Sequence, residues 1–241
     1  MDRSDDRALF RSGFVVAIDG PSGAGKSTVS RQLAVALGGV LLDTGAMYRA
    51  VAYHSLRQGA KTAGEFARIA RALKFDIDRD TQLLLVDGAD LGPRLRTEKV
   101  SEMASLVSRY KGVRAALTRR QRALGKTCMR RAPVVVEGRD IGTIVFPQVR
   151  FKFYVTADAK VRAARRYREL KRHGHRDARL KEVLRQIQLR DEQDSHRSIA
   201  PLRCPDDAIV VDTSSMGITQ VVHFLVDHIR GALSIPSGKR V

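Results

Sequence analysis

The 241-residue sequence predicts an α/β fold of three layers, with helices on both faces of a five-stranded parallel sheet. Two observations predict it. Short apolar runs alternate with segments of helical periodicity, and the runs are apolar at successive positions, as in strands buried on both faces. The runs expected to form strands are residues 14–18, 40–42, 134–136, 150–156 and 208–212. A chain of this length can form one such domain with an insertion.

The first run leads into a glycine-rich loop and then into a helix expected over residues 28–37, which Gly38 and Gly39 end. Strand, glycine-rich loop and helix in this order form the P-loop of nucleoside triphosphate enzymes, whose backbone N–H groups surround the β- and γ-phosphates. Lys26 is expected to reach those phosphates, and Ser27 is expected to ligate Mg²⁺. The residues expected to bind the nucleotide are Gly20, Pro21, Ser22, Gly23, Ala24, Gly25, Lys26, Ser27 and Thr28.

The pattern changes between residues 61 and 100. A helix is expected over residues 65–73, and the runs 74–78 and 82–88 are expected to pair as a hairpin with its turn at residues 79–80. A small β insertion on an α/β core is typical of a flap that closes over a substrate. The domain is therefore expected to span residues 14–233, with flexible tails at residues 1–13 and 234–241.

The charge of the chain is strongly positive and is concentrated in two segments. There are 44 Lys and Arg against 26 Asp and Glu, a formal net charge of +18. Residues 109–131 hold nine basic and no acidic side chains, and residues 160–203 hold 14 basic and six acidic ones. Such an excess favours polyanionic partners, either nucleic acid or phosphorylated small molecules, although much of it can also be solvated helix surface.

The composition also bears on the location of the protein. No run approaches the roughly 18 apolar residues of a membrane span, and the first six residues lack the apolar segment of a signal peptide. The two cysteines, Cys128 and Cys204, have neither a metal-ligand spacing nor a disulfide framework. These features predict a cytoplasmic protein with reduced thiols and no membrane segment.

A later helix carries a face that changes in character along its length. The apolar members of this face, expected to pack on the core, are Leu180, Val183, Leu184 and Ile187. At the same spacing the face continues as Arg190, Asp194 and Arg197. Two arginines around a carboxylate suit a phosphorylated sugar, with guanidinium groups for the phosphate and the carboxylate for ribose hydroxyls. The alternative is an intrahelical ladder of salt bridges.

Two further groups follow strands, at the edge where parallel sheets bind their ligands. After residues 40–42, Thr44 is expected to cap a helix, and Arg49 on that helix can bind an anion or lie on the surface. After residues 134–136, Arg139 and Asp140 emerge directly at the same edge. Their location favours a functional role over a structural ion pair.

Several strings of the sequence resemble those of bacterial cytidylate kinases, which are P-loop nucleoside monophosphate kinases. They are the loop string of residues 18–28, Leu-Asp-Thr-Gly-Ala-Met-Tyr-Arg at residues 42–49, and Glu-Gly-Arg-Asp-Ile-Gly-Thr-Ile-Val-Phe-Pro at residues 137–147. The late segment of residues 190–202, which ends in Ala-Pro-Leu, is also similar. The similarity covers about residues 15–228 with the motifs in order, so it is specific to this family rather than to P-loop proteins in general.

The resemblance implies transfer of the γ-phosphoryl group of ATP to CMP or dCMP. It also implies a β insertion that closes over the acceptor and an arginine-bearing lid, at about residues 160–190, that closes over the donor. By matching position, the residues that contact the acceptor phosphate are Arg49, Arg139 and Arg197. Those at the ribose are Arg190 and Asp194, and those around the cytosine edge are Thr44, Ser105, Arg114 and Asp140.

The sequence departs from the family pattern at two positions. Many relatives have Ser where this chain has Thr44, a change that retains the hydroxyl. Many also have Gly where this chain has Ser27. The assignment of Ser27 as the metal ligand is therefore clearer in this chain than in those relatives. Thr28 is the alternative ligand.

Such a transfer needs two aligned and neutralised anions rather than a general base, because the acceptor phosphate is largely dianionic at pH 7. None of the six histidines lies in a recognisable catalytic string. The residues expected to act in catalysis are Lys26, Arg139 and Arg197 with the lid arginines Arg162, Arg165 and Arg166, of which any one can contact the phosphoryl group. Glu137 can orient Mg²⁺ through water or can be a structural carboxylate.

The expected partners are ATP, with Mg²⁺, and CMP or dCMP, and the protein is expected to act as a monomer. One alternative is a P-loop ATPase bound to nucleic acid, which the charge suggests. The aromatic content of 5% and the absence of Trp disfavour it, because no base-stacking surface is evident. Another is a P-loop kinase of a different small molecule, such as shikimate or dephospho-coenzyme A, which would leave the face of Arg190, Asp194 and Arg197 without a ribose phosphate to bind.

Overall fold

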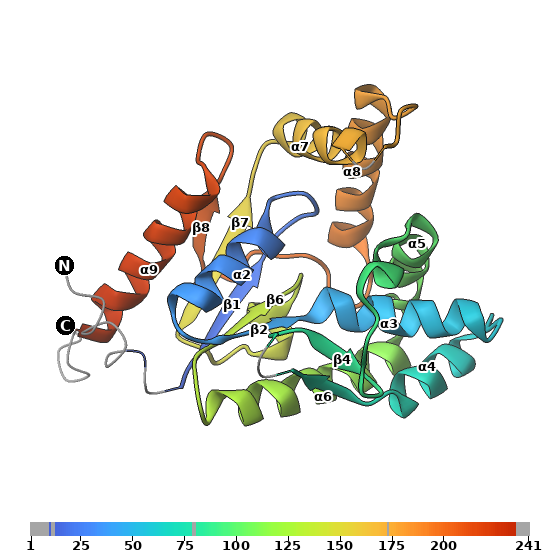
Figure 1. Ribbon diagram of the computed structural model, residues 1–241, viewed down its shortest axis with the longest axis horizontal. Helices are drawn as coiled ribbons and strands as arrows, with labels where there is room; N and C mark the ends of the chain where they lie inside the picture. The colour runs from blue at the N-terminus through green and yellow to red at the C-terminus, as the bar shows by residue number, and fades with distance from the viewer. Residues whose placement is uncertain (1–9, 11–12, 79–80, 173, 235–241) are drawn as a thin grey trace.

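The computed structural model describes residues 10, 13–78, 81–172 and 174–234, and its central layer is a five-stranded sheet (Figure 1). All five strands are parallel and lie in the order β2-β6-β1-β7-β8. Their bounds are β1 Val15–Asp19, β2 Val40–Asp43, β6 Val134–Glu137, β7 Phe151–Thr156 and β8 Ile209–Asp212. The predicted fold class is confirmed, and each strand begins and ends within one residue of its predicted bounds.

Helices cover both faces of this sheet, which makes the three layers (Figure 1). One face carries α2 Lys26–Ala36 and α9 Ile218–Ser234. The other face carries α3 Thr44–Arg57, α4 Ala63–Ala72, α5 Glu98–Val107 and α6 Lys111–Met129. A 3-10 helix, η1 Gly92–Arg96, precedes α5, and a single turn of π-helix, η2 Ile141–Val145, follows β6.

The central strand β1 supplies side chains to two separate cores because successive residues of a strand point to opposite faces. Val15 and Ala17 lie in the core closed by α3 to α6. Val16 and Ile18 lie in the core closed by α2 and α9. All five residues of β1 are buried, and the strand is paired on both sides. The carboxyl end of β1, from which the glycine-rich loop begins, is therefore rigidly placed.

The insertion contains an antiparallel sheet of three strands, β3 Phe75–Ile77, β4 Leu84–Val86 and β5 Ala89–Asp90. The expected hairpin is confirmed in the pairing of β3 with β4, while its turn at residues 79–80 lies outside the described residues. The third strand has only two residues, both exposed, so no apolar run in the sequence predicts it. The small sheet packs against α3 and α6.

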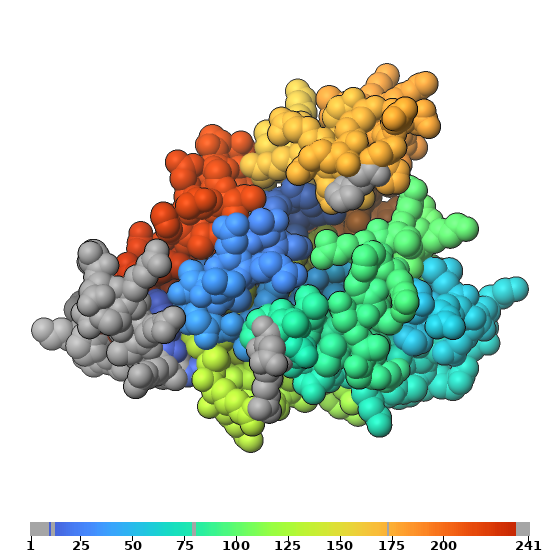
Figure 2. Space-filling model, in the orientation of Figure 1, coloured from blue at the N-terminus to red at the C-terminus, as the bar shows by residue number. Residues whose placement is uncertain are grey.

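The predicted lid region forms two packed helices, α7 Ala159–Arg172 and α8 Leu180–His196. Ala163, Val183 and Ile187 form a small core between them, separate from the two cores of the domain. Leu180, which was expected to face the core, is the first residue of α8 and is 47% exposed, outside the small core between the two helices. In Figure 2 the surface is hollowed between these gold and orange helices and the blue and green segments below them.

Most residues of the two predicted tails lie outside the described residues. Phe10 is described, and it is buried against Phe14, with ring centroids 6.3 Å apart. This contact places at least one residue of the predicted N-terminal tail on the core. In the part of the chain that the structure describes, no helix combines the length and the apolarity that crossing a membrane requires.

Gly20 has a backbone that excludes a side chain, so we expect Gly20→Ala to destabilise the fold. Its φ is +142°, and a Cβ there would lie 2.0 Å from the carbonyl oxygen of Val155. The expected loss is about 3 kcal/mol or more, measured as a lower midpoint of thermal unfolding.

The matched control is Gly64→Ala in α4, where an added Cβ meets nothing within 4 Å. That variant is expected to unfold within about 1 kcal/mol of the parent, with any change towards greater stability. Equal midpoints for the two variants would contradict the close packing of Gly20 on β7.

Candidate active site

The loop of residues 20–25 joins β1 to α2 in a conformation that glycine permits. Gly20, Gly23 and Gly25 all have positive φ, at 142°, 77° and 87°. Helix α2 begins at Lys26, two residues before the predicted start, and no side chain caps its first turn. The N–H groups of that turn and the positive end of the helix dipole therefore form an anion-binding loop.

Lys26 places a buried cation at this loop. Its side chain is 4% exposed, and its Nζ donates to the backbone oxygen of Pro21 at 2.7 Å. Burial, together with the nearby charge of Arg139, lowers the pKa of Lys26 to about 7, although Glu137 and Asp19 act in the opposite direction. A lysine in this environment gains strongly from an added anion, because a phosphate would offset both the burial and the neighbouring guanidinium group.

Ser27 and Glu137 form an oxygen-rich pair beside the loop. The Ser27 hydroxyl donates to Glu137 Oε1 at 2.8 Å, and among the described residues Oε2 of the buried Glu137 has no hydrogen-bond partner. Burial raises the pKa of Glu137, with the charge of Asp43 acting in the same direction. A buried carboxylate with an unused oxygen next to a hydroxyl fits a hard divalent cation. Within the described residues no cluster of three His, Cys, Asp or Glu side chains is placed to hold a metal. A cation here would therefore share its ligands with a bound phosphate.

The end of β2 supplies the next polar group. Asp43, not Thr44 as expected, is the N-cap of α3, because its carboxylate accepts from the N–H of Ala46 at 2.8 Å. Thr44 is the first helical residue, and its hydroxyl donates at 2.6 Å to the backbone oxygen of Glu137, so it joins the ends of β2 and β6. Arg49 pairs with Asp43 at 2.9 Å. Both predicted residues of this segment thus lie at the ligand edge of the sheet.

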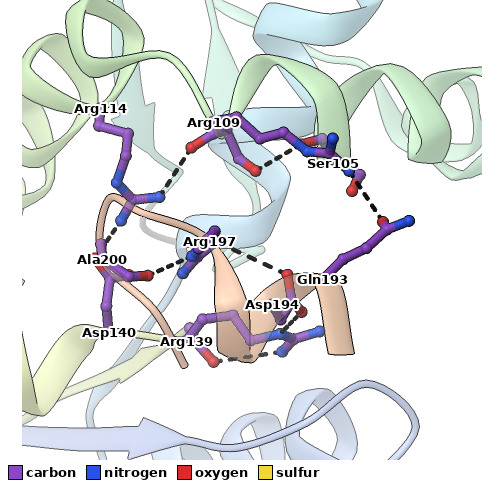
Figure 3. Close-up of polar contacts among 11 residues, drawn as sticks. Ser105, Arg109, Arg114, Arg139, Asp140, Gln193, Asp194, Arg197 and Ala200 are labelled. Atoms are coloured by element: carbon purple, nitrogen blue, oxygen red, sulfur yellow. Dashed lines mark hydrogen bonds and ion pairs between the residues drawn. The ribbon is translucent and has the colours of Figure 1, made fainter. Parts of the chain in front are cut away.

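A network of alternating charges lies near Lys26 of this loop, and Figure 3 shows its contacts. Arg139 Nε donates to Asp194 Oδ2 at 3.1 Å, and Arg197 Nη1 lies 3.8 Å from Asp194 Oδ1. Arg190 lies near Arg139 and Asp194, since the charge of Arg139 lowers the pKa of Arg190 and the charge of Asp194 raises it. The structure therefore brings together the β6 turn and the predicted face of α8, although these segments are far apart in the sequence.

Arg197 lies just beyond the helix on which it was expected. It is the C-cap of α8, with ψ at 138°, and the chain then turns through Ala200, whose φ is +52°. Its Nε donates to the backbone oxygen of Ala200, and this bond directs the side chain back to Asp194. The predicted proximity to Asp194 holds, but the turn and not the helical spacing produces it.

The cations of this network are not fully matched by protein acceptors. Among the described residues, Arg190 Nε and Arg197 Nη2 are buried without a hydrogen-bond partner. Burial lowers the pKa of both side chains, and for each of them a neighbouring arginine lowers it further. Buried, unpaired guanidinium N–H groups are costly unless an anion binds them. The cluster of Arg139, Arg190 and Arg197 is therefore suited to a phosphate.

Arg114 and Asp140 form a buried ion pair on the far side of this network (Figure 3). The Arg114 guanidinium also donates to the backbone oxygen of Ser108 at 3.2 Å and stacks over the ring of Tyr48 at 5.6 Å. Ser105 in α5 is half-buried, and its backbone oxygen accepts from the hydroxyl of Ser108 at 2.8 Å. The pair places the N–H donors of Arg114 next to the acceptor oxygens of Asp140. Recognition of a polar base edge requires donors and acceptors side by side in this way.

The lid arginines differ in their environments. Arg162 is buried and donates to the backbone oxygens of Ala157 and Ser22, at 2.9 and 3.0 Å, and it pairs with Asp191 at 2.7 Å. Arg165 donates to the hydroxyl and backbone oxygens of Thr213. Arg166 is half-exposed and pairs within its own helix with Glu169. Arg162 therefore links the P-loop, α7 and α8, and Arg166 is the most accessible of the three.

Two residues of the site were missed in the sequence. Asp191 pairs with Arg162, and Asp19 accepts hydrogen bonds from the backbone of η2. Asp191 follows Arg190 in the sequence but lies on another side of the helix. It is therefore not part of the predicted face that contains Arg190. Asp19 directly follows the predicted strand of residues 14–18, and a carboxylate at that position was the signal in the sequence.

The loop, the buried lysine and the facing arginines, set at the carboxyl edge of a parallel sheet, define a P-loop phosphotransferase. The residue patterns then assign the family. The cytidylate kinase family model matches residues 16–231, and the chain belongs to the cytidylate kinase family.

Individual relatives are similar over nearly the whole chain. The cytidylate kinase of Citrifermentans bemidjiense is 40% identical over 94% of this chain and 97% of its own length. That of Caldanaerobacter subterraneus subsp. tengcongensis is 42% identical over 89% of this chain and 94% of its own. That of Shewanella sp. (strain W3-18-1) is 41% identical, with coverages of 91% and 96%. Among solved structures, a shikimate kinase from Acinetobacter baumannii aligns with 94% of this chain and 98% of its own, at 18% identity and a TM-score of 0.45, a distant likeness.

Proposed function

We propose that the protein transfers the γ-phosphoryl group of ATP to CMP or dCMP, giving ADP and the nucleoside diphosphate. The observation that carries this proposal is the pair of facing anion sites. One is the loop with Lys26, and the other is the cluster of Arg139, Arg190 and Arg197, in which Arg139 and Arg190 lie close enough to lower the pKa of Lys26. Two phosphates bound at these sites would meet head-on, as in-line transfer requires.

In this proposal the protein acts by positioning and by neutralising charge. The loop N–H groups and Lys26 bind the β- and γ-phosphates of ATP, and Arg49, Arg139 and Arg197 hold the acceptor phosphate. Arg190, at the ribose side of the arginine cluster, contacts the ribose together with Asp194. Thr44, Ser105, Arg114 and Asp140 surround the cytosine. The lid arginines lie on the donor side, where a guanidinium group can stabilise charge on the transferred phosphoryl group. No proton acceptor is required, because the acceptor phosphate is already ionised.

Mg²⁺ is part of this proposal. When bound with ATP, it would neutralise charge on the phosphate oxygens. The Ser27 hydroxyl would ligate it, and Glu137, which accepts from Ser27 at 2.8 Å, would orient that hydroxyl and any bound water. The proposed site is complete within one chain, which fits a monomer. A reduced cytoplasmic location suits Cys128 and Cys204, neither of which forms a disulfide in the part of the chain that the structure describes.

Ser27→Ala is expected to raise the Mg²⁺ concentration for half-maximal activity about tenfold, since it removes both a ligand and the partner of Glu137. The measurement is initial rate against free Mg²⁺ at saturating nucleotides. The matched control is Ser30→Ala, one turn along α2, where the hydroxyl is buried and, among the described residues, without a hydrogen-bond partner. An unchanged Mg²⁺ dependence for Ser27→Ala would exclude this residue as the ligand.

The experiment that tests the proposed function is a coupled assay of ADP formation. The chain is offered ATP and Mg²⁺ with each common ribo- and deoxyribonucleoside monophosphate in turn. CMP and dCMP are expected to give the highest kcat/KM, because the buried Arg114–Asp140 pair presents both N–H and oxygen groups to the base. A clear preference for AMP, GMP or UMP would contradict the cytosine assignment and leave a kinase of another nucleotide.

A further inference from the structure

A buried carboxylate that the proposed chemistry does not use connects the two halves of the site. Asp19, the last residue of β1, is 1% exposed and immediately precedes Gly20 of the donor loop. Its Oδ1 accepts from the N–H of Ile141 at 2.8 Å, and its Oδ2 accepts from the N–H of Gly142 at 2.7 Å. These two N–H groups open η2, the π-helical turn that follows Arg139 and Asp140.

The turn needs this partner because its own capping residue is occupied. Asp140 is the N-cap residue of η2, yet its side chain makes no cap hydrogen bond. Its carboxylate pairs instead with Arg114. The first N–H groups of a helical turn are normally satisfied by such a local side chain. Here a carboxylate from a strand 122 residues earlier takes that place.

The surroundings of Asp19 hold it closely in this position. A Cβ added to Gly142 would lie 3.4 Å from Asp19 Oδ2 and 3.0 Å from the ring of Pro205, so the turn is packed directly on the carboxylate. The ionisable groups that face Asp19 are Lys26 on α2, Asp140 beside η2, Tyr154 on β7 and Cys204 after α8. Burial raises the pKa of Asp19 to about 6, while its two backbone hydrogen bonds act in the opposite direction.

We infer that Asp19 is a positioning residue that fastens the acceptor-binding turn to the end of the donor strand. By supplying both acceptors for η2, it frees Asp140 for Arg114 and sets the backbone from which Arg139 extends towards Asp194. The same residue fixes where the donor loop begins. This inference rests on the proposed function only for its kinetic consequences.

The kinetic test is Asp19→Asn, which keeps the shape but offers one oxygen and an N–H₂ group to two N–H donors. We expect kcat/KM for CMP to fall about 100-fold, mainly through a higher KM for CMP and a lower kcat, because the acceptor turn is misplaced. The KM for ATP is expected to change less, within about threefold, since the variant keeps the loop N–H groups and the Lys26 side chain and removes only one of the charges that act on Lys26. The matched control is Asp207→Asn, which changes a carboxylate in the turn before β8 that is 65% exposed and paired with Lys152, and it should keep parent kinetics.

A second measurement uses the unmodified chain and does not depend on its activity. Amide hydrogen exchange of Ile141 and Gly142 is followed at pH 7.5 and pH 5, with rates corrected for intrinsic exchange. Protonation of Asp19 removes one acceptor, so the protection of these two amides is expected to fall about tenfold at pH 5, while that of Val135 and Val136 is kept. Parent kinetics for Asp19→Asn, or protection that does not change with pH, would overturn the inference. Absence of CMP phosphorylation in the parent would overturn the proposed function instead, and the exchange result would still decide the role of Asp19.

Discussion

Lys26→Met is expected to lower kcat about a thousandfold and at the same time to raise the melting temperature. The loss of activity follows from the place of Lys26 in the anion-binding loop, where its ammonium group would stabilise the charge of the transferred phosphoryl group. The gain in stability follows from its burial, which with Arg139 nearby lowers its pKa from 10.5 to about 7. Activity is measured by ADP formation, and stability by thermal unfolding without nucleotide.

The sign of the stability change depends on pH. The folded pKa of Lys26 lies below its unfolded value, so the buried charge lowers stability at and below about pH 7, and this penalty fades as the pH rises towards 10.5. The advantage of Lys26→Met should therefore be largest near neutrality and shrink in alkaline buffer. Lys181→Met, at an exposed position on α8, is the control and should leave both quantities unchanged. A variant that loses stability but retains activity would contradict both roles assigned to Lys26.

Arg139→Met is expected to lower kcat/KM for CMP about a thousandfold, with a large part of the loss in KM for CMP. Arg139 contacts Asp194 at 3.1 Å and is also near Lys26, so it lies close to both proposed phosphate sites. Steady-state kinetics with CMP varied at saturating ATP and Mg²⁺ provide the measurement.

Two further variants sharpen this result. Arg139→Lys should recover little activity, because an ammonium group cannot bind Asp194 and a phosphate with the same planar arrangement of N–H groups. Arg185→Met removes an arginine whose side chain is 72% exposed and paired with Glu182, and it should behave as the parent. If Arg139→Met changed the KM for ATP but not that for CMP, Arg139 would belong to the donor side.

The sheet and the donor loop could be predicted from the sequence because their signals are local. Each strand is a short run of buried apolar residues, and the loop glycines at positions 20, 23 and 25 are the residues that tolerate its positive φ values. The lid helices were expected as well, since Val183 and Ile187 recur at helical spacing and are buried. Strand β5 was not expected, because two exposed residues carry no periodic pattern.

Features that depend on contacts between distant residues could not be predicted in this way. The hydrogen bonds of Asp19 to η2 and of Arg162 to Ser22 join segments more than a hundred residues apart. Asp43 was expected only to follow the strand of residues 40–42, and Thr44 was expected to cap the helix, because both side chains can accept a hydrogen bond from the first turn. The turn at Ala200 brings the Arg197 side chain close to Asp194. Its positive φ could not be predicted, because the residue there is alanine and not glycine.

The central claim is that donor and acceptor phosphates meet between the loop of residues 20–27 and the cluster of Arg139, Arg190 and Arg197. It is tested most directly by a crystal structure of the chain with a bisubstrate analogue that joins adenosine to cytidine through a chain of phosphates. The account predicts the phosphates on the adenosine side at the loop N–H groups and Lys26, and the cytidine beside the arginine cluster with its base at Arg114 and Asp140. A cytidine bound away from that cluster, or a phosphate chain that does not contact Lys26, would contradict it.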